Sequence, residues 1–243
     1  MSRRWLRTAA AALVAFTAAC AFAQAPLLQP LAGAPGALPL PWLVVGVPRQ
    51  PHPLTRFALV ELDGRRALRV ESNKSYGNLV HPLQELRGGS HLAWQWRVDE
   101  FVEQADLRTK AGDDAALKVC VFFDLPLARV PFVERQLLRL ARSSTSEPLP
   151  AATVCYVWDP HLPVDTVLHN AYTHRVRYLV LQSGPARLRE WTSERRNLSA
   201  DFQALFGQES AERPPIVGVA VGADADNTQG RSLAYVSSLV LEP

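Results

Sequence analysis

Most short motifs that identify an enzyme class are missing from this chain of 243 residues. It has no GxSxG nucleophile elbow, HExxH zinc helix, CxxC pair, phosphate-binding glycine loop or dinucleotide fingerprint. It has no internal repeat, and none of its six histidines forms a metal-spaced pair on one helix. These absences remove the enzyme classes that a sequence identifies most readily, and no motif fixes a reaction.

The chain also lacks a cluster of positive charge and a long hydrophobic run. Its 26 Lys and Arg outnumber its 23 Asp and Glu, but three of the arginines lie in the first 23 residues, which contain no acid. Without that segment the chain has 23 basic and 23 acidic residues. A neutral chain gives no support for nucleic-acid binding or for a polybasic membrane contact. No apolar run reaches the roughly 20 residues of a transmembrane helix.

Residues 1–23 have the pattern of a secretory signal peptide. Three arginines precede a short apolar run, and Ala21-Phe22-Ala23 offers a small-x-small cleavage site. A lipoprotein signal acylated at Cys20 is the alternative, but Thr17 stands where such signals carry a large aliphatic residue. We therefore expect cleavage after Ala23 and a periplasmic or secreted protein without a membrane span.

Residues 24–53 contain eight prolines, which predict an extended lead-in that joins no β-ladder. Residues 54–243 then alternate short apolar runs, rich in β-branched and aromatic residues, with turn residues. Asp63-Gly64 is a hairpin signal. The runs are LTRFALVEL, RALRVES, HLAWQWRV, ALKVCVFFD, ATVCYVW, RVRYLVLQS, IVGVAVG and LAYVSSLVL.

Two segments have helical spacing. Residues 133–142 form an amphipathic pattern, and residues 197–207 place Ser199 as N-cap and Gly207 as C-cap. About nine strands with two short helices in the connections predict an all-β fold, an antiparallel β-sandwich or jelly roll. We expect one such domain over residues 54–243, and a monomer.

Cys120 and Cys155 each lie in the middle of a strand-like run. In an exported protein two such residues pair when their Cα atoms come within about 7 Å. The favoured interpretation is two small buried hydrophobic side chains, and a disulfide is the alternative.

Four stretches resemble one family of exported bacterial proteins, domain of unknown function 3047, over roughly Thr55 to Leu241. They are ADLRTKAGDDAALKVCVFFD, LPAATVCYVWD, YTHRVRYLVLQSGPARLREWTSERRNLSADFQALFG and IVGVAVGADADNTQGRSLAYV. The resemblance implies an all-β domain and export, and it implies no activity. The family commonly has Arg where Lys118 stands. Lysine keeps the positive charge but cannot form the two parallel hydrogen bonds that an arginine guanidinium makes with a carboxylate. It commonly has Gly-Asp where Ser237-Ser238 stand, so a metal site using that Asp would lack a ligand.

The turn Gly222–Gly230 places Asp224, Asp226 and Thr228 at i, i+2 and i+4. This spacing resembles the first half of a calcium loop. The closing acid is missing, because Tyr235 stands in its place, so an EF-hand is excluded. Calcium held by these three residues and distant carbonyls is one interpretation. The favoured one is a hairpin loop closed by its own Asp and Asn side chains.

Asp113 and Asp114 precede the strand that carries Lys118. Adjacent strand residues point to opposite faces, so these two are poor partners for acid–base chemistry, and Asp114 with Asp224 would form a better pair. The simpler interpretation is a turn whose acids pair with Lys110 or Lys118.

Aromatic residues with neighbouring polar groups form the third candidate site, since sugars stack on flat rings. Trp94 and Trp96 share a face with apolar neighbours and are assigned to the core. Trp158 and Trp191 are the exposed candidates. Arg195, Arg196 and Asn197 follow Trp191, although the two arginines could instead cap the sheet edge or pair with Asp201.

These patterns favour an exported, non-catalytic binding module for a glycan or another cell-envelope ligand, with a structural calcium as an option. The alternatives are a polysaccharide hydrolase or lyase that uses paired carboxylates and an envelope scaffold that binds protein. The candidate ligand-binding residues are Asp113, Asp114, Lys118, Trp158, Trp191, Arg195 and Asn197.

Overall fold

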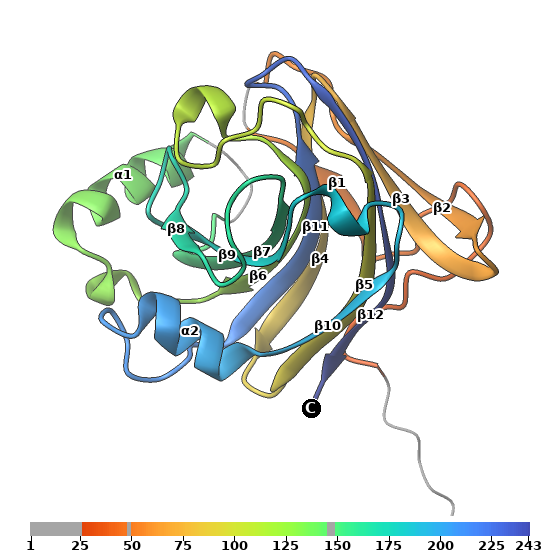
Figure 1. Cartoon of the computed structure of the whole chain (residues 1–243). Coiled ribbons are helices and arrows are strands. Elements are labelled where there is room, and N and C mark those ends of the chain that lie inside the picture. The colour runs from red at the N-terminus through yellow and green to blue at the C-terminus, as the bar shows by residue number, and fades with distance from the viewer. Residues whose placement is uncertain (1–25, 48–49, 145–148) are drawn as a thin grey trace, which may run out of the picture.

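A computed structural model describes residues 26–47, 50–144 and 149–243 and shows two β-sheets that face each other (Figure 1). One sheet has seven strands in the order β1-β4-β11-β6-β7-β9-β8, and the other has five in the order β10-β5-β12-β3-β2. All named strand pairs except β7–β9 are antiparallel. The predicted all-β sandwich is confirmed.

The elements have the following bounds. The seven-stranded sheet contains β1 (Leu43–Val45), β4 (Tyr76–Leu86), β6 (Ala115–Phe123), β7 (Ala152–Asp159), β8 (Val167–His169), β9 (Val176–Ser183) and β11 (Ile216–Asp224). The five-stranded sheet contains β2 (Arg56–Leu62), β3 (Arg65–Asn73), β5 (His91–Glu100), β10 (Thr192–Asn197) and β12 (Arg231–Glu242). The helices are α1 (Phe132–Ser143) and α2 (Leu198–Phe206), with short 3-10 turns at Lys110–Gly112, Leu127–Arg129 and Pro185–Arg187. In the ranges described, no helix is long and apolar enough to cross a bilayer.

The core between the sheets is built around aromatic side chains. Trp94 and Trp96 on β5 are buried, as predicted, with ring centroids 5.4 Å apart. Tyr156 and Trp158 on β7 meet them from the opposite sheet at 5.2 and 6.1 Å. This arrangement follows from the period-two alternation, because every second residue of these strands points inward.

The turn between β2 and β3 has the backbone that its sequence predicts. Asp63 and Gly64 have φ values of 52° and 70°, so both central residues are left-handed, as a two-residue type I′ hairpin requires.

The parallel pairing of β7 with β9 was not predicted. β8 lies at the outer edge of the sheet, and β9 returns antiparallel to it, between β8 and β7. β7 and β8 run in opposite directions, so β9, which is antiparallel to β8 and lies between them, runs parallel to β7.

The proline-rich lead-in enters the fold, contrary to our expectation that it joins no ladder. β1 pairs with β4, because Leu43–Val45 contains no proline and keeps its N–H groups. Leu28 and Trp42 are also buried in the core, and the Trp42 indole donates to the Gln29 carbonyl at 2.7 Å. The predicted signal peptide, residues 1–23, falls outside the described residues.

Both predicted helices are present. α2 ends at Gly207 as expected, but its N-cap is Asn197, whose side chain accepts from the amides of Ser199 and Ala200 at 3.1 and 2.9 Å. The N-cap therefore lies two residues before the predicted one, because the side-chain oxygen of Asn197 already accepts from these free N–H groups.

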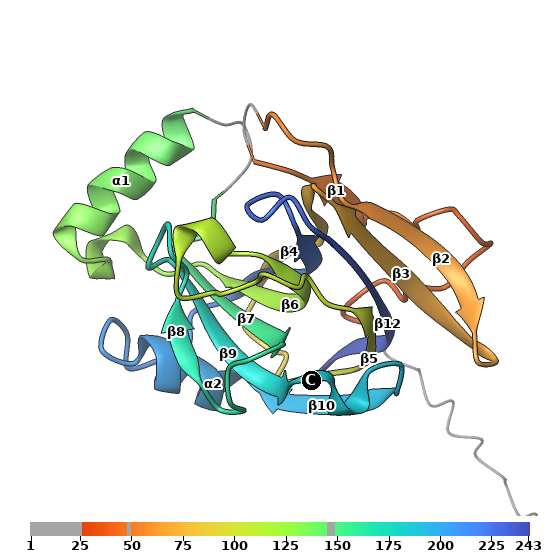
Figure 2. The ribbon, with the colours of Figure 1, turned by 45° about the horizontal axis from the view of Figure 1, so that its top comes forward.

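Figure 2 shows the two sheets from a second direction. The central strands of the seven-stranded sheet, β6, β7 and β11, are buried on both faces. The inner face packs on the other sheet, and the outer face carries a second cluster that includes Cys120, Cys155, Tyr178 and Ala220. Cys120 and Cys155 are direct cross-strand partners, with Cα atoms 4.1 Å apart, and they form a disulfide. The favoured interpretation of two free buried thiols was therefore wrong, because sequence does not give the register of β6 on β7.

Replacing both cysteines by Ala should lower the free energy of unfolding by roughly 3–4 kcal/mol, since the bond closes a loop of 35 residues. Urea denaturation with and without a reductant measures this. The reductant should shift the midpoint of the wild-type protein towards that of the Cys120→Ala/Cys155→Ala variant and leave the variant unchanged. Equal midpoints for oxidised wild type and the variant would contradict the prediction.

Candidate functional site

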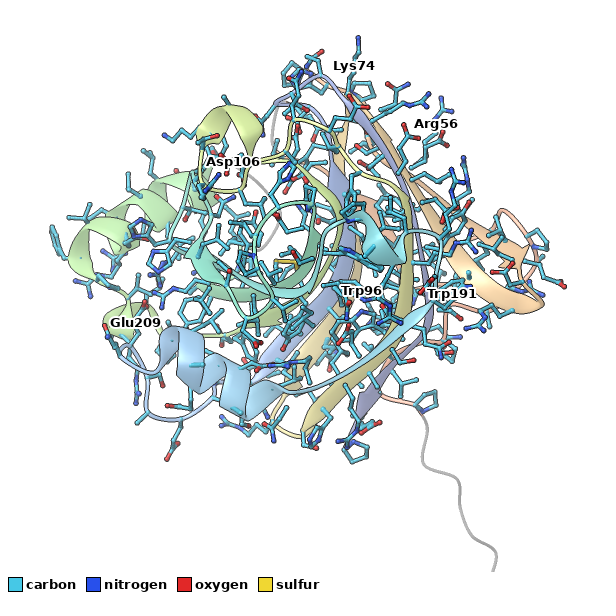
Figure 3. The ribbon with its side chains drawn as sticks, in the orientation of Figure 1. Arg56, Lys74, Trp96, Asp106, Trp191 and Glu209 are labelled. Carbon is cyan, nitrogen blue, oxygen red and sulfur yellow. A yellow bond between two sulfur atoms is a disulfide. The ribbon has the colours of Figure 1, made fainter. Side chains whose placement is uncertain are left out.

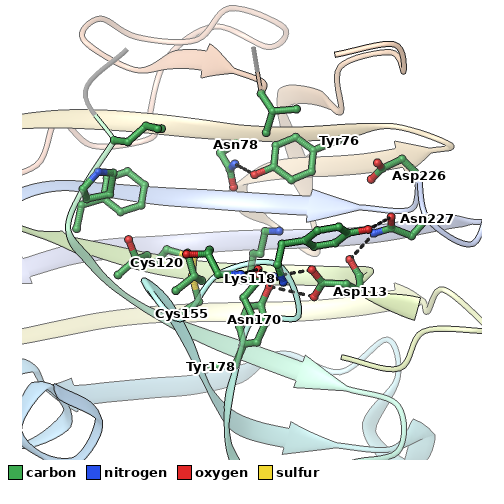
Figure 4. A pocket seen from close by; sticks show the side chains of 18 residues that line it. Tyr76, Asn78, Asp113, Lys118, Cys120, Cys155, Asn170, Tyr178, Asp226 and Asn227 are labelled. Carbon is green, nitrogen blue, oxygen red and sulfur yellow. Dashed lines mark hydrogen bonds between the residues drawn. A yellow bond between two sulfur atoms is a disulfide. The ribbon is translucent and has the colours of Figure 1, made fainter. Parts of the chain in front are cut away.

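A pocket of about 460 Å³ lies on the outer face of the seven-stranded sheet, away from the core between the sheets. Figure 4 places the disulfide to one side of Lys118, and Asp113, Asp226 and Asn227 to the other. The polar lining is Tyr76, Asn78, Asp113, Lys118, Thr153, Asn170, Tyr172, Thr173, Tyr178, Asp226 and Asn227. The apolar lining is Val47, Phe122, Leu149, Pro150, Val176 and the disulfide.

The floor of the pocket carries a buried ion pair between neighbouring strands. Lys118 on β6 donates from Nζ to Oδ2 of Asp224 on β11, and both side chains are nearly inaccessible. The other oxygen of Asp224 accepts from the Ala115 amide at 2.7 Å. Since each charge is out of water, the pair depends on this mutual contact.

The pKa values of the pair follow from that burial. Burial raises the pKa of Asp224 to about 6, against the opposing charge of Lys118, and Asp113 and Asp114 add to the rise. Burial alone would lower the pKa of Lys118, but the charge of Asp224 and the nearby Tyr178 and Tyr76 raise it well above its ordinary value. Both groups are therefore charged at neutral pH.

Asp113 forms the wall beside this pair. Its carboxylate accepts from the Asn170 amide at 2.5 Å and from the Tyr178 hydroxyl at 3.4 Å. Burial raises its pKa, although the charge of Lys118 opposes the rise. Asn170 in turn donates to Tyr178 at 3.0 Å, so a closed network fixes the geometry of this wall.

Asp114 has a structural role. It faces away from the pocket and accepts from the amides of Asn227 and Thr228 at 3.1 and 2.8 Å and from the Thr228 hydroxyl at 2.6 Å. Asp114 therefore holds the turn that begins at Asp224. The predicted acid–base pair of Asp114 with Asp224 does not form, because Asp114 binds this turn and Asp224 pairs with Lys118.

The turn after Asp224 is not a hairpin loop closed by its own side chains. It carries the chain from β11 in one sheet to β12 in the other, so its flanking strands do not pair with each other. Asp114, from a distant segment, supplies the main closing contacts, while Gln229 donates to the Asp226 carbonyl and Gly230 to that of Ala225. The sequence could not show that the chain changes sheets here.

The calcium interpretation meets side chains that have other partners. The Asp224 carboxylate forms an ion pair with the ammonium group of Lys118, and the Thr228 hydroxyl donates to Asp114. In the described ranges, no three His, Cys, Asp or Glu side chains converge as ligands for a metal ion. Ser238, where the family commonly has Asp, lies on β12 in the other sheet and does not adjoin this turn.

Asp226 differs from the other acids of the site. Its Oδ1 atom is buried and has no hydrogen-bond partner among the described residues. Burial raises its pKa, and the charge of Asp114 adds to the rise. Asp226 lines the pocket, but Oδ1 is covered by protein atoms, so a ligand there can reach only the other carboxyl oxygen, Oδ2.

The predicted aromatic and arginine residues lie elsewhere. Trp158 is 1% exposed in the core, so its assignment as an exposed ligand-binding side chain was wrong. Trp191 is partly exposed beside the five-stranded sheet (Figure 3), where its indole donates to Asp63 and Arg65 lies 4.8 Å from its ring centroid.

The polar residues that follow Trp191 have structural partners. Arg196 pairs with Asp201 at 2.6 Å, as the alternative interpretation proposed, whereas Arg195 pairs with Glu242 at 2.7 Å, which was not predicted. Asn197 caps α2. None of these residues lines the pocket.

Sequence reasoning missed eight of the eleven polar residues of the pocket, and four of them show why. Tyr76 and Asn78 come from β4, which was not recognised as a strand because Pro82 interrupts it and polar residues flank it. Tyr178 lay in a recognised strand, and Asn170 in a loop that no motif marked. Alternation of Tyr76 and Asn78 with buried neighbours is the signal that could have found the first two.

Comparison with known proteins identifies the family of the chain. A family model described as protein of unknown function (DUF3047) matches residues 41–240. The chain belongs to this family. Membership confirms the resemblance noted from the sequence and brings no activity with it. No curated protein matches the chain.

A solved structure from a comparison of family 12 glycoside hydrolases is similar to this DUF3047 chain. The likeness covers 77% of this chain and 87% of that one, with 9% identity and a TM-score of 0.38. A similarity this distant carries no argument about function.

The buried ion pair generates a prediction about pH. Lys118→Met leaves Asp224 without its cation, so the pKa of this carboxyl, about 6 in the wild-type protein, should rise further. A carboxyl whose pKa is higher in the folded state than in the unfolded chain lowers the free energy of unfolding as pH rises through that interval. The variant should therefore be nearly as stable as wild type at about pH 4 and on the order of 3 kcal/mol less stable near neutrality.

Urea denaturation at intervals between about pH 4 and 8 measures this difference. Lys110→Met, which removes a lysine from the exposed turn nearby, is the matched control and should show no pH-dependent loss. A Lys118→Met cost that is equal at both ends of the range would refute the account.

Proposed function

We propose that this protein binds a saccharide of the cell envelope in the pocket beside Lys118, without catalysing a reaction on it. The observation that carries the proposal is a pocket in which Lys118 and Tyr76 keep hydrogen-bond donors that no described residue uses, next to an apolar lining. Its volume, about 460 Å³, falls within the usual range of small-molecule sites.

The free polar atoms suit hydroxyl groups, which both donate and accept. Lys118 has three donors and gives one to Asp224. The Tyr76 hydroxyl accepts from Asn78 at 3.1 Å and keeps its own hydrogen for a ligand. Asp226 lines the far wall and offers its uncovered oxygen, Oδ2, as an acceptor. A ligand with hydroxyls along one edge can satisfy all three.

The opposite lining suits the apolar C–H face of a sugar ring. It consists of Phe122, Val176 and the disulfide in the sheet, with Leu149 and Pro150 above them. Because the polar wall is already tied together by the Asp113 network, little ordering cost remains for a ligand that fits it.

The disulfide supports the expected compartment. Structural disulfides persist in oxidising environments such as the periplasm and the cell exterior. This agrees with the signal peptide that residues 1–23 predict, so an envelope glycan is a ligand that the protein could meet.

Calorimetric titration with a panel of envelope oligosaccharides tests the proposal. Tyr76→Phe and Asn78→Ala should each weaken binding about three- to tenfold, the loss expected for one hydrogen bond. Tyr235→Phe makes the same chemical change in the other sheet and should leave the affinity unchanged. Absence of binding across the panel would reject the saccharide and favour the scaffold alternative.

A hydrolase or lyase is the second candidate, and a specific observation favours it. Asp113 and Asp226 both line the pocket, and burial raises the pKa of each, as a carboxyl that transfers protons requires. The wild-type protein should then release soluble sugars from purified cell-wall polysaccharide, and Asp226→Asn should abolish the release. Glu190→Gln, at an exposed site away from the pocket, is the matched control. Binding without any product release would retain the first function and eliminate this one.

A further inference from the structure

The pocket beside Lys118 contains more negative than positive charge. Asp113, Lys118 and Asp226 are the charged residues that line it. Lys118 forms an ion pair with Asp224, which does not itself line the pocket. Because that pair is neutral as a whole, the carboxylates of Asp113 and Asp226 lack a cation of their own among the described residues.

A further carboxylate behind the pocket adds to this surplus. Asp114 is buried and accepts from the amides of Asn227 and Thr228, so it pairs with backbone groups and not with a cation. Burial raises the pKa of Asp226, and the charge of Asp114 adds to the rise. The site as a whole therefore sets four acids against Lys118.

No other described residue with a positive charge lines the pocket. Lys110 is exposed and lies over the ring of Tyr172, with its ammonium nitrogen 5.3 Å from the ring centroid. The charge of His52 only partly opposes the rise in the pKa of Asp226. Both cations lie outside the lining, so the acids of the pocket keep an unbalanced charge.

The fold holds these acids in place. Both lining carboxylates lie on the same side of Lys118 (Figure 4). The segments that carry them are tied together, because the Asn227 side chain donates to the backbone carbonyl of Asp113 at 3.0 Å. The Asp113 carboxylate is itself bound by Asn170 and Tyr178. Negative charges that are fixed around one pocket and partly removed from water repel each other, and a bound cation relieves this repulsion.

We propose that the saccharide unit held in this pocket carries a free, protonated amine, as an amino sugar without an acetyl group does. Its ammonium group donates to the carboxylate of Asp113 and to Oδ2 of Asp226. The hydroxyls of the same ring accept from Tyr76 and from Lys118, which is 5% exposed and keeps donors that no described residue uses. This inference rests on the proposed function, because it names the class of saccharide that the same pocket binds.

Other saccharides fit this pocket less well. The carboxylate of an acidic sugar accepts from Lys118 but adds a negative charge beside Asp113 and Asp226. A neutral sugar, including an N-acetylated one, uses the free donors and leaves both carboxylates without a cation. Hydrogen bonds between charged groups are roughly twice as strong as those between neutral groups, so the amine should decide which saccharide binds most tightly.

Calorimetric titration with matched trisaccharides tests the inference. Trimers of glucosamine, N-acetylglucosamine and glucose, joined by the same linkage, differ only in carrying an amine, an amide or a hydroxyl at one ring position. The glucosamine trimer should bind at least tenfold more tightly than the other two. A trimer of galacturonic acid tests the acidic alternative and should bind more weakly than the glucose trimer.

One variant and a control assign the preference to this pocket. Asp226→Asn removes a charge and keeps the shape of the side chain. It should weaken binding of the glucosamine trimer about tenfold and leave that of the glucose trimer unchanged, since an amide oxygen still accepts from a hydroxyl. Asp165→Asn makes the same change at an exposed residue that does not line the pocket, and it should bind every trimer as wild type does. Circular dichroism should show the same fold for both variants.

Equal or tighter binding of any of the other three trimers would overturn the inference and leave the proposed function in place. An unchanged preference for the amine in Asp226→Asn would overturn it as well, because the amine would then bind elsewhere. Absence of binding by every saccharide would reject the proposed function together with the inference.

Discussion

The ion pair of Lys118 with Asp224 is the interaction on which the pocket depends. The central strands of the seven-stranded sheet are buried on both faces, so a charged residue there must find its partner within the sheet. β6 and β11 supply one charge each at neighbouring positions. That contact allows the outer face to carry a polar floor, and Asp114 fixes the following turn so that Asp226 and Asn227 reach the same pocket.

The sequence predicted the parts of the fold that follow from local periodicity. The eight apolar runs correspond to strands, and the Asp63-Gly64 turn and both helices are present. Four strands escaped notice: the polar edge strand β10, the proline-containing β4, and the three-residue strands β1 and β8, which are too short to show a period. The disulfide and the parallel β7–β9 pair depend on which strands become neighbours. The alternation of apolar and polar residues along one strand does not show that.

The candidate site could be predicted in part for the same reason. Asp113 and Lys118 were candidates because an acid pair precedes the strand that carries the lysine, and Asp226 because of its spacing from Asp224 and Thr228, and all three line the pocket. Their partners Asn78, Asn170 and Tyr178 come from separate segments, so only the folded chain assembles them. Trp158 was wrongly predicted to be exposed. A strand has two faces, and the local sequence does not show which of them packs against the second sheet.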